Sequence, residues 1–222
     1  MQIIIIDGSS ENDPCYDYVS RLKSNPRNTI VLCKYNIGHG RGMDYAIGLC
    51  KTKVAMIFDS DIRMLKSPVE KMLAMMESDT YGVGYLEKTG LDGYEYGAHA
   101  NHKTEPFMWM LHPYFQLLQI SEYHKFHPYV HHGAPCYLAA LDIYRKGLTS
   151  KIIKEFPGLG HSSGKGWNWV GEPREYIQHD TAGTRKARKL KGKSEIDGGW
   201  VYEKNSSFGN RFLDQRIQRK RF

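Results

Sequence analysis

One stretch constrains the fold more than any other: residues 54–61 read Val-Ala-Met-Ile-Phe-Asp-Ser-Asp. A short apolar run of this kind predicts a β-strand that is buried on both faces, as in a sheet covered by helices. Alternate strand residues share a face, so we expect Asp59 and Asp61 to lie side by side. Such hard oxygen ligands suit Mg²⁺ or Mn²⁺, which take further ligands from phosphate and water. A pair this short also occurs in solvated turns.

The composition fits a globular chain that forms one large α/β domain or two small ones. Of 222 residues, 41% are hydrophobic and 25% are charged. The longest aliphatic run, residues 3–6, is too short to cross a bilayer, and no signal-peptide pattern precedes it. The four cysteines form no C-x-x-C pair. These features favour a reduced, cytoplasmic protein without a transmembrane segment.

The positive charge lies mainly near the end of the chain. The net charge is +7, with basic clusters at 185–193 and 211–221. Such an excess attracts nucleic acid, anionic lipid or a phosphorylated substrate, or it forms only a solvated surface. Because the composition changes here, we divide the chain into a domain at 1–185 and a basic C-terminal extension at 186–222.

Strands and helices alternate along the first part of the chain. We expect strands at 1–6, 29–34 and 53–58, and helices at 14–23 and 43–51. Parallel strands joined by helices require right-handed crossovers. The order therefore predicts an α/β fold with a mostly parallel central sheet and helices on both faces.

Polar residues follow each of these three strands. The first strand ends in Asp7, the second leads into Asn36-x-Gly38, and the third ends in Asp59-x-Asp61. Ligands of open α/β sheets bind outside the carboxyl ends of the strands, so we expect the three motifs to form one rim. The rim offers a carboxylate for a base or ribose, glycines for close backbone approach and a metal site for phosphates. Taken singly, Asp7 also fits a turn cap, and the glycines fit a plain loop.

Three motifs together resemble the nucleotide-binding half of GT-A glycosyltransferases, and most closely the family-2-like, mostly inverting group. They are Ile-Ile-Asp-Gly-Ser-Ser at 5–10, Asn-Ile-Gly-His-Gly at 36–40 and Phe-Asp-Ser-Asp at 58–61. The similarity is close over 1–65, the nucleotide-binding half, and holds in outline over 66–185, the acceptor and donor-sugar half. The resemblance implies a GT-A-like (Rossmann-like) fold. It also implies transfer of a sugar from a UDP- or other NDP-sugar to a glycan or other hydroxyl acceptor.

The resemblance also implies roles for particular residues. In that family the aspartate that matches Asp7 contacts the uracil, the one that matches Asp59 reaches the ribose or the metal, and the one that matches Asp61 binds Mn²⁺ or Mg²⁺. His179, at the end of a strand expected at 174–180, matches a histidine that completes the metal site. Further contacts to the nucleotide-sugar are expected from Ser9, Asn36, Gly38, Arg41, Asp44, Ser60, His132, Gly133 and Arg185.

The chain departs from the family pattern in two ways. Family members begin with a strand and a helix that precede the Asp-Gly-Ser strand, so here the front is removed or the domain is a minimal version. Its compact form and its unusual start are similar to those of glycosyltransferase domains of large algal DNA viruses. This resemblance implies that the protein is located in the cytoplasm of the host cell. The Glu-Asp pair that supplies the family's catalytic base has no clear counterpart. Our candidates are Glu172, which precedes the expected strand of His179, and then Asp92.

The second half is expected to receive the acceptor. We expect a helix at 67–76, a strand at 81–86, a long irregular segment at 87–128 and a strand at 136–140. The aromatic residues of the irregular segment either stack on acceptor sugars or cover the sheet; they include Tyr94, Tyr96, Phe107, Trp109, Tyr114 and Phe115.

Other functions stay open at this point. A sugar-phosphate nucleotidyltransferase has a similar layout, but it carries a basic Gly-rich loop after its first strand, which residues 7–10 lack. A nucleic-acid-binding module that uses the basic tail predicts salt-sensitive binding but leaves the rim unexplained. An inactive sugar-binding homologue fits as well. We expect a metal-dependent glycosyltransferase, and we do not expect nucleic acid as a partner.

Overall fold

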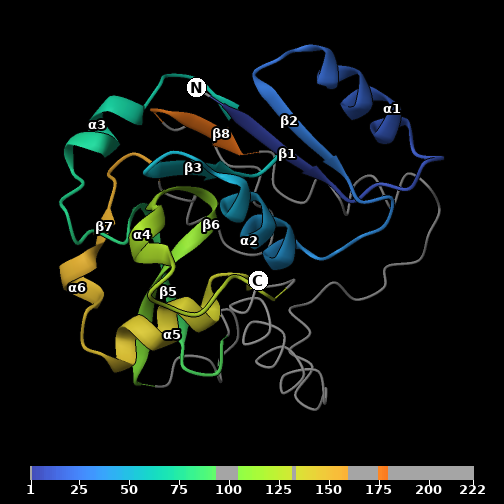
Figure 1. The fold of residues 1–222 in the computed structure, drawn as a ribbon. Helices are drawn as coiled ribbons and strands as arrows, with labels where there is room; N and C mark the ends of the chain where they lie inside the picture. Colours follow the sequence, from blue (N-terminus) through green and yellow to red (C-terminus); the bar gives the residue numbers. More distant parts are fainter. Residues whose placement is uncertain (1, 94–104, 132–133, 160–174, 180–222) are drawn as a thin grey trace.

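The computed structural model describes residues 2–93, 105–131, 134–159 and 175–179 (Figure 1). The helices of these ranges are α1 (Pro14–Arg21), the 3-10 helix η1 (Leu22–Ser24), α2 (His39–Leu49), α3 (Val69–Ala74), α4 (Ile120–Tyr123), α5 (Tyr137–Arg145) and α6 (Thr149–Ile152). The strands are β1 (Ile3–Asp7), β2 (Asn28–Leu32), β3 (Val54–Phe58), β4 (Ile62–Met64), β5 (Gly82–Gly90), β6 (Phe107–Gln119), β7 (Ile153–Glu155) and β8 (Ile177–His179). No helix in the described ranges is long and apolar enough to cross a membrane.

The first part of the chain alternates between strands and helices as predicted, but the described strands form separate sheets. β1 and β2 pair in parallel, β3-β6-β5-β7 form a sheet in that order, and β4 pairs with β8. The pairs β3–β6, β5–β6 and β4–β8 are antiparallel, and only β1–β2 and β5–β7 are parallel. β3, β5 and β7 therefore run in one direction, and β6 runs against them. The described strands form a mixed sheet beside the parallel pair β1–β2, which does not by itself confirm the expected mostly parallel central sheet.

The second half differs from the expected elements most clearly in two segments. The segment at 107–119 was expected to be irregular, but it forms β6, the longest described strand with 13 residues. The segment at 136–140 was expected to be a strand, but α5 begins at Tyr137 and packs on β6. Its Leu and Ala residues favour a helix, and a short apolar run does not distinguish a strand from a buried helix.

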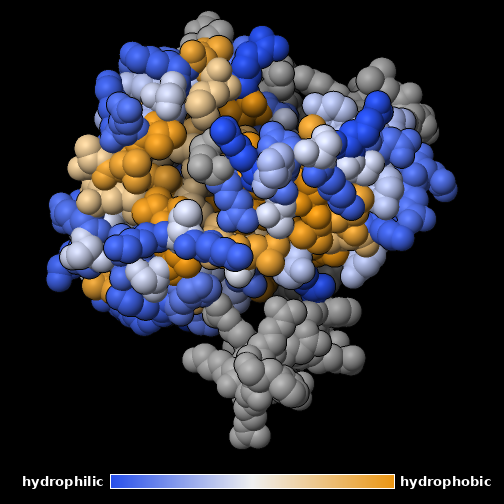
Figure 2. Space-filling model, turned by 45° about the horizontal axis from the view of Figure 1, so that its top comes forward, coloured by the Kyte–Doolittle hydropathy of each residue, from blue (hydrophilic) through white to orange (hydrophobic). Residues whose placement is uncertain are grey.

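The core lies around β5 and β6 rather than around the aliphatic strands. In β3, which was expected to be buried on both faces, only Ala55 is buried and Phe58 is 52% exposed. Within the described residues β3 pairs only with β6 and β1 only with β2, so each has one unpaired edge. Figure 2 shows apolar residues reaching the surface on one face of the molecule. The largest fully buried side chains include Tyr81, Tyr114, Phe115, Leu118, Tyr123, Tyr129 and Ile143.

The sequence left two roles open for the aromatic residues of 87–128: they either stack on acceptor sugars or cover the sheet. Their burial in the structure distinguishes the two roles for some of them. Tyr114 and Phe115 are buried in the core, so they cover the sheet. Trp109 is 42% exposed on β6, and Phe107 packs edge-on against it with 5.9 Å between the ring centroids. Tyr94 and Tyr96 lie outside the described residues.

Candidate functional site

The ends of β1, β2 and β3 meet, as the sequence predicts. A Cβ atom added to Gly8, just after β1, would lie 3.3 Å from the Cα of Asn36, which follows β2. His39, the first residue of α2, connects the same loop to Asp59 after β3, with 3.2 Å between His39 Nε2 and Asp59 Oδ1. The three polar motifs therefore form one continuous rim.

Asp7 is the buried carboxylate of this rim, only 8% exposed at the end of β1. Its Oδ1 accepts hydrogen bonds from Ser9 N (3.2 Å) and Ser9 Oγ (2.8 Å). Its Oδ2 is buried and has no hydrogen-bond partner in the described structure. Burying an oxygen without a donor is unfavourable, so Oδ2 is a ready acceptor for a donor group on a ligand. Ser9, expected to touch the ligand, holds Asp7 in place.

The loop between β2 and α2 is shaped by its own residues. Asn36 Oδ1 accepts a hydrogen bond from Gly38 N at 2.8 Å, which turns the chain towards α2. Gly38 has a φ of 85°, in the left-handed region that glycine adopts without strain. Asn36 and Gly38 therefore set the path of the loop. Arg41 is exposed in the first turn of α2.

Asp44, which was expected to contact the nucleotide-sugar, joins α2 to α4. Its Oδ1 accepts a hydrogen bond of 2.7 Å from the hydroxyl of Tyr123. The same hydroxyl accepts a hydrogen bond from Tyr129 N at 2.9 Å. Burial raises the pKa of Tyr123, and the Asp44 carboxylate adds to the increase, so Tyr123 stays a neutral donor. The contact fixes α2, which carries His39.

Gly40 allows the start of α2 to pack closely against the backbone of residues 130–131. A Cβ atom here would lie 2.5 Å from His131 O and 2.7 Å from Val130 N.

We expect Gly40→Ala to lower the free energy of unfolding by about 1–3 kcal/mol, because two backbones would have to separate. The control is Gly48→Ala in the same helix, where nothing lies within 4 Å of the added Cβ. It should raise stability by about 0.5–1 kcal/mol. Urea denaturation measures both, and equal stability of the two variants would contradict the packing.

Asp59 and Asp61 lie in a turn and not on an extended strand. β3 ends at Phe58, and Ile62 N donates to Asp59 O at 3.3 Å, which closes a turn over the exposed Ser60. The expectation that strand alternation aligns the two carboxylates is therefore wrong, although both still follow β3.

The strand pair β4–β8 connects the aspartate turn to the late part of the chain. His179 is the register partner of Ile62, the residue directly after Asp61, so the backbone of His179 lies beside the turn. Among the side chains that the structure describes, no group of three or more His, Cys, Asp or Glu residues is placed to hold a metal. The side chain of His179 is not among them. The carboxylates of Asp59 and Asp61 are hard oxygen donors that fit Mn²⁺ or Mg²⁺, and an added imidazole would favour the transition metal Mn²⁺.

The remaining predicted site residues lie after β5 or outside the described ranges. Asp92 is exposed in the turn after β5. The residues outside the described ranges are His132, Gly133, Glu172 and Arg185.

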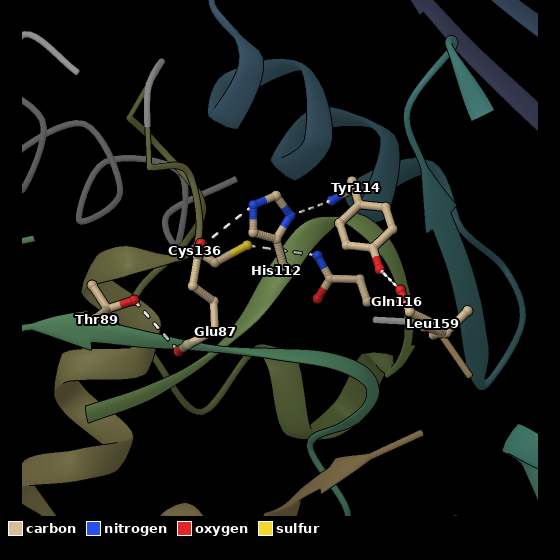
Figure 3. Close-up of polar contacts among 7 residues, drawn as sticks. All are labelled: Glu87, Thr89, His112, Tyr114, Gln116, Cys136 and Leu159. Atoms are coloured by element: carbon tan, nitrogen blue, oxygen red, sulfur yellow. Dashed lines mark hydrogen bonds and ion pairs between the residues drawn. The ribbon is translucent and has the colours of Figure 1, made fainter. Parts of the chain in front are cut away.

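The sequence interpretation missed two groups near the rim. One is His39, whose only sequence signal is its place between two glycines at the start of a helix. The other is a buried pair in which His112 Nε2 on β6 lies 3.4 Å from Glu87 Oε2 on β5 (Figure 3). The available signal was a glutamate, Glu87, directly after the apolar strand expected at 81–86.

Cys136, just before α5, carries a buried thiol. Burial raises the pKa of Cys136 to about 12, and the nearby carboxylates of Asp59 and Glu87 contribute to the increase. Cys136 Sγ accepts a hydrogen bond of 3.5 Å from Gln116 Nε2 (Figure 3). Cys136 is therefore a protonated residue of the core.

Comparison with known families identifies the fold that carries this rim. A model of the family described as glycosyl transferase family 2 matches residues 1–143, well over half of the 222 residues. A search of curated proteins gave no match. The matched range contains Asp7, the Asn36 loop, the aspartate turn and the Glu87–His112 pair. The chain belongs to glycosyl transferase family 2.

Proposed function

We propose that this protein is a metal-dependent, inverting glycosyltransferase that moves a sugar from a UDP-sugar to a hydroxyl group of a glycan or another acceptor. Family membership supports glycosyl transfer from a nucleotide-sugar in general and implies the α/β GT-A fold. The observation that carries the finer proposal is the meeting of Asp7, the Asn36 loop and Asp59 at one rim. We assign residues 1–185 to this domain and 186–222 to a basic extension.

The state of Asp7 supports uracil as the base. Uracil presents an N–H group at its N3 position, and Asp7 Oδ2 is a buried acceptor without a partner in the described structure. Cytosine carries an acceptor at the same position, so it would face the carboxylate with the wrong polarity. Asp7 therefore favours UDP over CDP.

The aspartate turn supports binding of the diphosphate. Asp61, with Asp59 and His179, would hold Mn²⁺ or Mg²⁺, and the bound ion would stabilise negative charge on the departing diphosphate. His39 lies against Asp59 and helps to fix its carboxylate. Arg185 is proposed to add a positive charge near the leaving group, and His132 and Gly133 to border the donor sugar.

A thermal-shift screen of nucleotide-sugars with Mn²⁺ or with EDTA tests this function. At a ligand concentration of about 100 times Kd, binding adds about 2.7 kcal/mol of stability. For a chain of this size that is an increase in Tm of roughly 5–10 °C. We expect UDP-sugars to give this shift with Mn²⁺ and to lose it in EDTA, while the free sugar gives none.

The alternatives predict different results in the same screen. A nucleotidyltransferase would be stabilised by a nucleoside triphosphate with a sugar phosphate, and a nucleic-acid-binding module by an oligonucleotide at low salt. Absence of a shift with every nucleotide-sugar in the presence of Mn²⁺ would contradict the proposed function.

A further inference from the structure

β5 and β6 lose their regular pairing beside the aspartate turn. Gly84 pairs with Gln116 and the next pair is Leu86 with Leu111, so Tyr85 faces all of residues 112–115. Such bulges redirect side chains and are over-represented next to active sites. Pro113 lies inside the bulge, where its missing N–H breaks no regular strand pairing. The irregularity therefore places side chains of β5 and β6 in positions that a regular hairpin would not give them.

A chain of polar contacts joins this bulge to the rim. Asp59 N donates to Tyr114 O at 2.9 Å, and Tyr114 N donates to His112 Nδ1 at 3.3 Å. His112 Nε2 lies 3.4 Å from Glu87 Oε2 (Figure 3). Because Nδ1 accepts a hydrogen bond, the proton of a neutral His112 is assigned to Nε2, where it faces Glu87. The backbone of Tyr114 thus fixes Asp59 on one side and, through His112, Glu87 on the other.

The pair of Glu87 and His112 lies at the same end of the sheet as the donor rim, where an acceptor must approach the donor sugar. β6 is antiparallel to β3, with Phe115 opposite Phe58, so the residues of β6 before Phe115 extend beyond the carboxyl end of β3. His112 lies two residues before Tyr114, in the part of β6 that extends beyond this end of β3. The donor rim also lies at the carboxyl end of β3. His112 and Glu87 therefore lie just past the proposed diphosphate site.

The Glu87 carboxylate is held more rigidly than a surface acid. Glu87 is 5% exposed, and the side chain of His112 is 13% exposed. A carboxylate oriented by a second group is the arrangement that an acid–base residue requires.

We propose that Glu87 is the base that takes the proton from the acceptor hydroxyl, with His112 as its positioning residue; this rests on the proposed glycosyl transfer. The hydroxyl oxygen forms a bond to the anomeric carbon while its proton passes to Glu87. The bond between that carbon and the diphosphate oxygen breaks, and its electron pair leaves with the nucleoside diphosphate. Glu87 ends protonated, and the charge is balanced.

Glu87→Gln tests the role directly, because it keeps the shape of the side chain and removes the basic oxygen. We expect kcat for transfer to fall by about 10²–10⁴-fold, as for loss of a general base. The Mn²⁺-dependent thermal shift with a UDP-sugar should be unchanged. The control is Glu122→Gln, which removes another buried carboxylate, on α4 and ion-paired with Lys125, and should leave kcat unchanged.

The pH profile of kcat/KM separates a base from a structural ion pair. In the unsubstituted protein the rate should rise with pH as the base loses its proton, and the residual activity of Glu87→Gln should lack this increase. Glu87→Asp keeps the charge but moves it back by one methylene. It should retain donor binding with a reduced kcat, and it serves if the glutamine variant does not fold.

Two variants of His112 test its positioning role. An asparagine side chain can replace Nδ1 as the acceptor for Tyr114 N, whereas a glutamine can replace Nε2–H as the donor to Glu87. We therefore expect His112→Gln to retain more of kcat than His112→Asn, with equal KM for the donor. A merely structural pair would give the two variants similar kcat values.

The outcomes distinguish this inference from the function on which it rests. Full transfer activity with an unchanged pH profile in Glu87→Gln, or an undiminished kcat in Glu87→Asp, would overturn the role of Glu87. If Glu87→Gln lost both its transfer activity and its thermal shift with the donor, the role of Glu87 as a base would also be overturned, because the Glu87–His112 pair would then be structural. Absence of any nucleotide-sugar shift in the unsubstituted protein would overturn the proposed function and this inference with it.

Discussion

Replacing Asp61 with alanine is expected to lower kcat/KM for sugar transfer by about 10³-fold or more. A bound divalent cation stabilises leaving-group charge by several kcal/mol, and roughly 4 kcal/mol corresponds to about a 10³-fold change in rate. The fold should survive, because Asp61 is only partly buried in a turn after β3. Initial rates of sugar transfer over a series of Mn²⁺ concentrations measure the effect.

The control for this variant is Asp79→Ala, which removes an exposed aspartate from the turn before β5. β5 begins opposite the part of β6 that pairs with Ala55, at the end of β3 remote from the rim. It should keep the activity and the Mn²⁺ dependence of the unsubstituted protein. If Asp61→Ala retained full, Mn²⁺-dependent transfer, the metal assignment would be wrong.

The second large effect is expected at Asp7, where asparagine should weaken UDP binding by about 10–100-fold. Ser9 donates two hydrogen bonds to Oδ1, so the amide oxygen of the new side chain must take that position. Its NH₂ group then replaces Oδ2 and faces the N3–H of uracil, donor against donor. Loss of such a buried hydrogen bond costs about 1–3 kcal/mol.

Calorimetric titration with UDP and with CDP measures this change. The unsubstituted protein should prefer UDP, and Asp7→Asn should narrow or reverse the preference, because N3 of cytosine is an acceptor. The control is Asp13→Asn, since asparagine also caps a helix and Asp13 caps α1 through Cys15 N. Unchanged UDP affinity in Asp7→Asn would show that the base binds elsewhere.

The rim was predictable because its signals are local. Each motif directly follows an aliphatic strand, and the rule that carboxyl ends of strands meet at one edge brings Asp7, Asn36 and Asp59 together. The structure confirms that meeting. The sequence could not show that Asp59 and Asp61 lie in a turn, because the hydrogen bond from Ile62 to Asp59 leaves no mark in the apolar pattern.

β6 could not be predicted because most of its residues are buried and it lacks the alternation of a half-exposed strand. Pro113 further suggests an irregular segment, whereas the structure accommodates it in a bulge opposite Tyr85. Because β6 was not predicted, the pair of Glu87 and His112 was missed as well. Its two members are distant in sequence and meet only through the pairing of β5 with β6.

A crystal structure of the protein with UDP and Mn²⁺ tests the central claim most directly. We predict that the uracil lies against Asp7 with its N3–H on Oδ2, and that the diphosphate and the metal lie at the turn of Asp59 and Asp61. Density for the nucleotide away from this rim, or a metal bound without either aspartate, would contradict the proposed donor site.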